Sequence, residues 1–144
     1  MDDLSLVNVN KLGIVAEGHE EIKKSLEGQF RGETGEIGLY LAMANMAQRE
    51  GYPEIGEVLK RIAWEEAEHA ARYAELLGKF SCITKDNLEQ MLQGEKGSNK
   101  YKTELAAKCK ESNLDEVHDF INEAAKDEAR HAQMLKGMLD RYFS

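Results

Sequence analysis

Two short motifs each occur twice in this sequence, and both pairs share one separation. The segment EAEHA at residues 66–70 corresponds to EARHA at 128–132, and GETG at 32–35 corresponds to GEKG at 94–97. In both cases the copies lie 62 residues apart. A single glutamate–histidine pair arises easily in a glutamate-rich chain, but a shared register does not. The sequence therefore predicts two copies of one structural unit.

Residues that favour helix dominate the chain around these motifs. Ala, Leu, Met, Glu and Lys are common, Pro53 is the only proline, and no segment alternates as a strand does. Gly51 suits a left-handed helix end and Pro53 suits the first turn of the next helix, while Thr84 and Asn113 are plausible N-caps. These signals predict four helices, over about residues 20–50, 53–77, 85–111 and 114–142.

The repeat pairs these helices into two helical hairpins of the same design. Isolated helices this polar would be marginal in water, so they must pack on one another. We therefore expect an all-α four-helix bundle that occupies residues 20–144 as one domain. Residues 1–19 are weakly patterned and are predicted to form an N-terminal arm, either irregular or a short helix.

Composition excludes several classes of partner. The net charge is −8 and no basic stripe is present, which argues against nucleic acid. No apolar stretch approaches the ~20 residues that a membrane span needs, and the N-terminus lacks the pattern of a signal peptide. The two cysteines, Cys82 and Cys109, form no C-x-x-C pair and cannot make a four-thiolate metal site. We expect reduced thiols in a cytoplasmic protein.

The repeated motif carries a specific chemistry. A Glu-x-x-His pair puts both side chains on one helix face, where a carboxylate can bridge two metals and an imidazole can bind one. One Glu from each of two helices plus a Glu-x-x-His pair from each of the other two is the ligand pattern of dinuclear carboxylate sites in bundles. Measured from the hairpin turns at 1.5 Å per residue, the residues of each copy reach about the same level. These residues are Glu33, Glu66, His69, Glu95, Glu128 and His131.

Some residues near this set allow two interpretations. The six residues themselves are either a metal site or a charged surface, and the small alanines around them favour the metal site. Glu65 and Asp127 could accept the second ring N–H of the ligand histidines or could be ordinary surface acids. Tyr40 lies seven residues after Glu33, where it is either a hydrogen-bond donor to a ligand carboxylate or a core residue. The pair of Asp115 and His118 has no repeat counterpart and is read as surface.

Carboxylate-rich sets with two imidazoles suit iron or manganese, whereas zinc prefers closed four-coordinate sites.

The ordered ligand set, with the flanking segments REGYPEI at 49–55 and AWEEAEHA at 63–70, resembles the rubrerythrin family of ferritin-like di-iron proteins. The resemblance covers about residues 25–143. Most members carry a seventh ligand three residues after the third-helix glutamate, where this chain has Ser98. Here the extra carboxylate is Glu36, three residues after Glu33, as in the "reverse" rubrerythrin subgroup. Most members also carry a four-cysteine rubredoxin domain, which these 144 residues do not contain.

This resemblance implies roles for individual residues. Glu66 and Glu128 would bridge two irons, while Glu33, Glu95, His69 and His131 would bind one iron each. Glu36 would be a mobile seventh ligand. Together with Tyr40, the possible hydrogen-bond donor to a ligand carboxylate, Glu36 is our candidate catalytic residue. Manganese or zinc could substitute for iron.

The resemblance also implies a function. The family reduces hydrogen peroxide to water and so protects cells against oxidative stress, which here requires an external electron donor such as rubredoxin or another reductase. An iron-binding ferroxidase or storage protein without sustained turnover is the alternative, and a helical interaction module with a vestigial site is a weaker one. The resemblance implies a ferritin-like topology in which the second and third helices run parallel, and with that topology their short connection predicts a homodimer that exchanges its C-terminal hairpins. An up-down-up-down bundle would need no such exchange.

Overall fold

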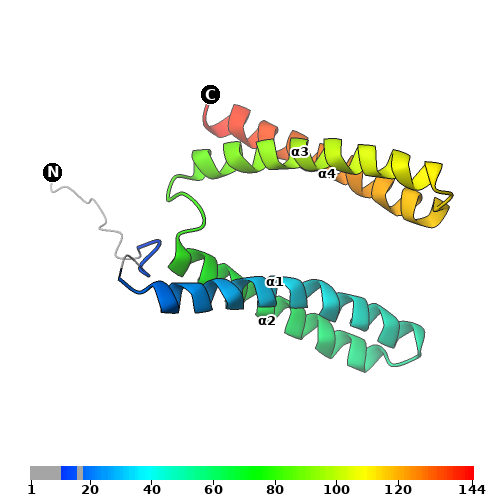
Figure 1. Ribbon diagram of the computed structural model, residues 1–144, viewed down its shortest axis with the longest axis horizontal. Helices are drawn as coiled ribbons and strands as arrows, with labels where there is room; N and C mark the ends of the chain where they lie inside the picture. The colour runs from blue at the N-terminus through cyan, green and yellow to red at the C-terminus, as the bar shows by residue number, and fades with distance from the viewer. Residues whose placement is uncertain (1–10, 16–17) are drawn as a thin grey trace. The chain divides into compact units, whose positions relative to one another are not determined.

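The computed structural model describes residues 11–15 and 18–144, and its regular elements in that part of the chain are four α-helices. They are α1 (Glu20–Arg49), α2 (Pro53–Leu77), α3 (Thr84–Glu111) and α4 (Asp115–Tyr142). The chain divides into two compact units, Met1–Phe80 and Ser81–Ser144. In the first, α1 packs along α2, and in the second, α3 packs along α4 (Figure 1). We call these pairs the N-terminal hairpin and the C-terminal hairpin. The predicted all-α class is confirmed.

The turn of the N-terminal hairpin and the end of α2 follow the sequence signals. Gly51 has a φ of +88°, a left-handed conformation that glycine adopts without steric cost, and Pro53 is the first residue of α2. Gly78 ends α2 with a φ of +63°. Its Cα region lies so close to Gly13 that a Cβ on Gly78 would come within 3.1 Å of the Gly13 Cα. Gly13 also donates its backbone N–H to the Glu75 carbonyl at 2.8 Å, which ties this part of the predicted arm to the end of α2.

Two predicted N-caps are wrong. Thr84 is already the first residue of α3, and Ile83 precedes it as N-cap without a side-chain bond. The connection is instead held by Asn87, whose side chain accepts from the Ser81 N–H at 2.8 Å and donates to the Ser81 carbonyl at 2.7 Å. Asn113 ends α3 with a φ of +57°, but the N-cap of α4 is Leu114. A residue in the left-handed conformation cannot also adopt the extended geometry of an N-cap, which explains the error.

Small residues fill the contact between the helices of each hairpin. The buried residues are Ala44, Ala47, Gly56, Ala63 and Ala70 in the N-terminal hairpin, and Leu92, Ala106, Cys109, Ala125 and Ala132 in the C-terminal hairpin. At Gly56 a Cβ would meet the Ala44 carbonyl oxygen at 3.1 Å, so the backbones of α1 and α2 approach closely there. The glycines of the repeated motifs and their neighbour make no such close approach within the hairpins, because a Cβ at each would meet nothing within 4 Å; they are Gly32, Gly35, Gly38, Gly94 and Gly97.

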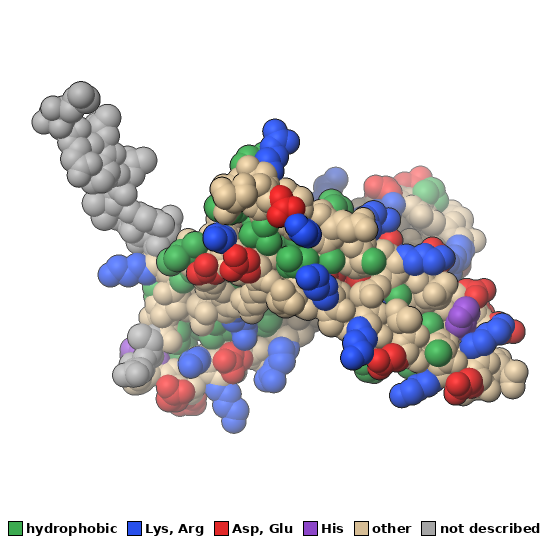
Figure 2. Space-filling model, turned by 90° about the horizontal axis from the view of Figure 1, so that it is seen from above, with side chains coloured by type: hydrophobic (Ala, Val, Ile, Leu, Met, Phe, Trp, Pro, Cys, Tyr) green, Lys and Arg blue, Asp and Glu red, His purple; other side chains and the backbone are tan. Residues whose placement is uncertain are grey.

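Large apolar side chains remain uncovered on both hairpins. Leu39 and Trp64 on the N-terminal hairpin are 64% and 68% exposed, and Phe120 on the C-terminal hairpin is 70% exposed. Figure 2 shows apolar side chains at the surface between charged ones. Large exposed apolar surfaces of this kind are typical of an interaction surface. Within the described residues, none of the helices is long and apolar enough to cross a membrane.

Candidate metal centre

Two carboxylates and one imidazole meet where α1 and α2 face each other. Glu33 projects from α1, while Glu66 and His69 project from one face of α2 because they are three residues apart. His69 Nδ1 lies 3.1 Å from Glu33 Oε2 and 3.2 Å from Glu66 Oε2. One ligand atom from each residue lies within 4.8 Å of the others. We call these three residues the N-terminal cluster.

The environment of the N-terminal cluster is unfavourable for two bare carboxylates. The side chains of Glu33 and Glu66 are only 16% and 18% exposed. Burial raises the pKa of the Glu33 carboxyl above its usual value, and the neighbouring Glu66 raises it further. The hydrogen bond to Glu66 raises the pKa of the His69 imidazole, and Glu33 adds to this effect. A divalent cation in this position would relieve the repulsion between the carboxylates.

The second copy of the motif builds a matching group on α3 and α4. Glu95, Glu128 and His131 also place one ligand atom each within 4.8 Å of the others, and we call them the C-terminal cluster. His131 Nδ1 lies 3.5 Å from Glu95 Oε2 and 3.7 Å from Glu128 Oε2. The six residues that the repeat singled out therefore lie in two groups of three, one in each hairpin.

The C-terminal cluster differs from its counterpart in two ways. The ammonium group of Lys102 forms an ion pair with Oε1 of Glu128. Oε2 of Glu95 is buried and has no hydrogen-bond partner within the described part of the chain. A buried carboxylate oxygen without a partner is costly, and a bound cation is one of the few groups that can satisfy it. The donor set and this unpartnered oxygen fit a metal site.

Lys102 is a contact of the C-terminal cluster for which the sequence carries a signal. Lys102 lies seven residues after Glu95, which is the repeat position of Tyr40, seven residues after Glu33. Residues seven apart lie on the same helix face, so a lysine there is within reach of the cluster. The repeat thus replaces the tyrosine by a lysine, but it does not indicate that the lysine pairs with Glu128.

Other predicted residues lie outside the two clusters. Glu36 is exposed and Tyr40 is half-buried, and neither makes a side-chain hydrogen bond within the described residues. Glu65 is exposed as well. Asp127 pairs with Arg130 at 2.9 Å rather than with His131. The seventh-ligand role of Glu36 and the assisting role of Tyr40 therefore stay predictions.

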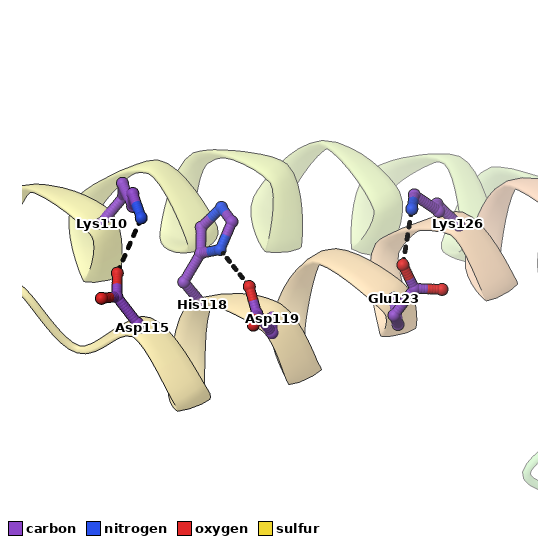
Figure 3. A network of polar contacts seen from close by, with 6 residues as sticks. All are labelled: Lys110, Asp115, His118, Asp119, Glu123 and Lys126. Atoms are coloured by element: carbon purple, nitrogen blue, oxygen red, sulfur yellow. Dashed lines mark hydrogen bonds and ion pairs between the residues drawn. The ribbon is translucent and has the colours of Figure 1, made fainter.

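Asp115 and His118 share the Asp/Glu-x-x-His spacing of the clusters but do not meet. Asp115 accepts a hydrogen bond from Lys110 at 2.7 Å, and His118 instead contacts Asp119 at 2.9 Å (Figure 3). The hydrogen bond to Asp115 raises the pKa of Lys110, and that to Lys110 lowers the pKa of Asp115. Among the described residues, this pair belongs to no group of three possible metal ligands, so the spacing alone does not build a site.

Comparison with known proteins identifies the family. The family model described as rubrerythrin matches residues 24–84 and 86–144. This chain belongs to the rubrerythrin family. Reverse rubrerythrin-1 of Clostridium acetobutylicum is 48% identical over 135 residues, which cover 93% of this chain and 75% of that protein. A protein of Methanocaldococcus jannaschii, described as uncharacterized, is 55% identical over 141 residues, covering 98% and 99% of the two chains. The rubrerythrin of Porphyromonas gingivalis is 27% identical, covering 83% of this chain and 70% of that protein.

Membership of the rubrerythrin family defines the fold to which the two hairpins belong. Rubrerythrin domains are ferritin-like helical bundles that bind a di-iron centre. Both matched segments contain one hairpin and one cluster, so the family match extends over all six residues of the two clusters.

Proposed function

We propose that this protein is a non-haem di-iron peroxidase that reduces hydrogen peroxide to water with electrons from another protein. The observation that carries the proposal is the pair of matching clusters, each with two sheltered carboxylates and one imidazole. The ferritin-like bundle of the family requires two hairpins, and it would bring one cluster of each kind together. Oxidative-stress protection in the cytoplasm is the role that fits this chemistry and the two free thiols.

The residues of the two clusters would bind two irons, each residue with its own ligand role. Glu66 and Glu128 each offer two carboxylate oxygens, which suits a bridge between the metals, while Glu33, Glu95 and the two histidines would bind one metal each. When bound there, a diferrous pair would supply the two electrons that cleavage of the peroxide O–O bond consumes. The balanced reaction takes up two protons and yields two water molecules. Glu36 and Tyr40 on α1 are the proposed catalytic residues, Glu36 as a mobile ligand and Tyr40 as a hydrogen-bond donor to a ligand carboxylate.

The electrons must be replenished after each turnover. The 144 residues contain only Cys82 and Cys109, and both are free thiols, so they hold no four-cysteine iron site. We infer that a redox site outside these 144 residues, such as that of rubredoxin or a reductase, delivers the electrons. In stopped-flow mixing without a donor, the reduced protein should react once with peroxide and then stop. Repeated turnover with NADH alone would contradict an external protein donor.

An iron-binding ferroxidase is the second candidate, because the same ligand set binds iron that is merely stored or detoxified. The two functions differ in turnover. With purified rubredoxin and its reductase present, a peroxidase consumes many peroxide molecules per di-iron unit, and the rate scales with the donor concentration. A ferroxidase consumes iron in proportion to the oxidant and stops when the iron is ferric. Peroxide consumption limited to one equivalent per di-iron unit, at any donor concentration, would reject the peroxidase.

A further inference from the structure

The two clusters are not equivalent, and Lys102 is the reason. Its side chain is 27% exposed and contacts Glu128, whose side chain is 15% exposed, so the pair is partly shielded from water. Within the described residues, Glu66 at the matching position contacts His69 and no lysine or arginine. A positive charge therefore accompanies one of the two carboxylates proposed above as bridges before any metal is bound.

The distances in the C-terminal cluster agree with this difference. His131 Nδ1 lies 3.5 and 3.7 Å from its two carboxylates, whereas His69 Nδ1 lies 3.1 and 3.2 Å from the equivalent oxygens. Glu128 offers Oε1 to Lys102, and the Oε2 of Glu95 is left without a hydrogen-bond partner. The ammonium group thus occupies an oxygen that a bridging carboxylate would need for a metal.

We propose that Lys102 is a positioning residue that holds Glu128 in the metal-free protein and competes with the metal for its Oε1 oxygen. The proposal rests on the metal site proposed above. A cation entering the C-terminal cluster must displace the ammonium group or tolerate it nearby, and both lower the affinity through charge repulsion. The N-terminal cluster carries no such charge, since its repeat position holds Tyr40. Metal loading is therefore ordered: the N-terminal cluster binds first and more tightly.

The test is a titration of the metal-free protein with Co²⁺ against a chromophoric chelator, followed by thermal unfolding with and without Co²⁺. The unaltered protein should show a tight and a weak binding step. Lys102→Gln should tighten the weak step about tenfold, equivalent to about 1.4 kcal/mol. The same variant should lower the melting temperature of the metal-free protein, because Glu128 loses its partner. A merely structural lysine would lower the stability without raising the affinity.

Three further variants isolate the charge. Lys100→Gln removes an exposed lysine two residues away on α3 and should leave both steps unchanged. Lys102→Arg keeps the charge and should behave as the unaltered protein does. Tyr40→Lys places a charge at the matching position and should weaken the tight step, which keeps the proposal testable if Lys102→Gln does not fold.

The outcomes separate this proposal from the function on which it rests. Two equal steps in the unaltered protein, an unchanged affinity in Lys102→Gln, or a tightened step in Lys102→Arg would overturn the role of Lys102 and leave the metal site intact. An unaltered protein that binds no Co²⁺ would overturn both.

Discussion

His69 and Glu33 lie 36 residues apart in the chain, on different helices, and their Nδ1 and Oε2 atoms are 3.1 Å apart. His131 and Glu95 are separated by the same 36 residues and meet at 3.5 Å. In each hairpin, a histidine of the second helix thus lies close to a glutamate of the first helix. The equal separation shows that both hairpins bring their ligands to the same height above the turn, which is what a pair of matched metal sites needs.

The histidines of the clusters should be required for metal binding. We expect His69→Ala and His131→Ala each to lower the iron content from two per pair of clusters to about one, because each removes the only nitrogen ligand of its cluster. Elemental analysis after anaerobic loading measures this. The matched control is His118→Ala, which removes a histidine of similar helical spacing that contacts Asp119 instead. Loss of iron in the control, or full iron content in both cluster variants, would contradict the assignment.

Metal binding should depend on pH through His69. The hydrogen bond to Glu66 and the charge of Glu33 raise the pKa of His69 above 6.5, so the metal-free imidazole keeps its proton to higher pH than a free histidine does. A metal must displace that proton, so the affinity should rise with pH until the imidazole is neutral and then level off. The interactions of protonated His69 with Glu66 and Glu33 stabilise the metal-free fold fully below pH 6.5. This contribution to stability is lost as the pH rises through the raised pKa of His69.

Calorimetric titration in buffers of different ionisation enthalpy measures the protons released. We expect more protons to be released per bound metal at pH 6.5 than at pH 8.5. In His69→Ala, we expect this difference in proton release to be smaller. An equal release at both pH values would show that His69 is already neutral in the metal-free protein.

Glu36 should matter for turnover more than for metal content. Its position three residues after Glu33 places it beside the N-terminal cluster along α1, but it is exposed and outside the group of close ligand atoms. Glu36→Ala should therefore keep both metals and lower peroxide turnover by about tenfold or more. Glu104→Ala on α3, which removes an exposed acid that belongs to neither cluster, is the control. Unchanged single-turnover kinetics in Glu36→Ala would show that Glu36 takes no part.

The sequence predicted the two clusters because their geometry follows from helix periodicity. Glu66 and His69 share a face by their spacing, and the equal offsets from the turn bring Glu33 to their level. These relations need only regular helices and a short hairpin turn. The burial of Ala63, Ala70, Ala125 and Ala132 follows from the same faces.

Features that depend on side-chain conformation could not be predicted in this way. Lys102 reaches Glu128 across the hairpin, and a flexible lysine on that face could equally have extended into solvent. The connection before α3 differs from the prediction because it is held by the Ser81–Asn87 pair, which forms between residues six apart in an irregular segment. The glycines of α1 and α3 meet no neighbour within their own hairpins, so a pattern within one sequence could not show what they face.

The last prediction concerns which chain supplies the second hairpin. If the two hairpins assemble with the ferritin-like topology that the resemblance implies, α2 and α3 run parallel, and Glu66 and Glu95 come to the same level. Eleven residues follow Glu66 in α2 and eleven precede Glu95 in α3, so the connection must span about 33 Å along the bundle. Residues 78–83 are available, and their backbone reaches at most about 25 Å. We therefore expect two chains to exchange C-terminal hairpins, so that each metal site combines the N-terminal cluster of one copy with the C-terminal cluster of the other.

Complementation tests this exchange directly. Glu66→Ala and Glu128→Ala proteins, each inactive alone, are unfolded, mixed and refolded with iron. In an exchanged mixed dimer one site carries both substitutions and the other carries neither, so the wild-type site restores peroxide turnover to about a quarter of the normal value per chain when dimers form at random. Glu33→Ala mixed with Glu66→Ala is the control, because both changes lie in the N-terminal hairpin and every site stays damaged. If mixed dimers form and the first mixture remains inactive, each chain closes its own site and the connection must lengthen by unwinding the ends of α2 or α3.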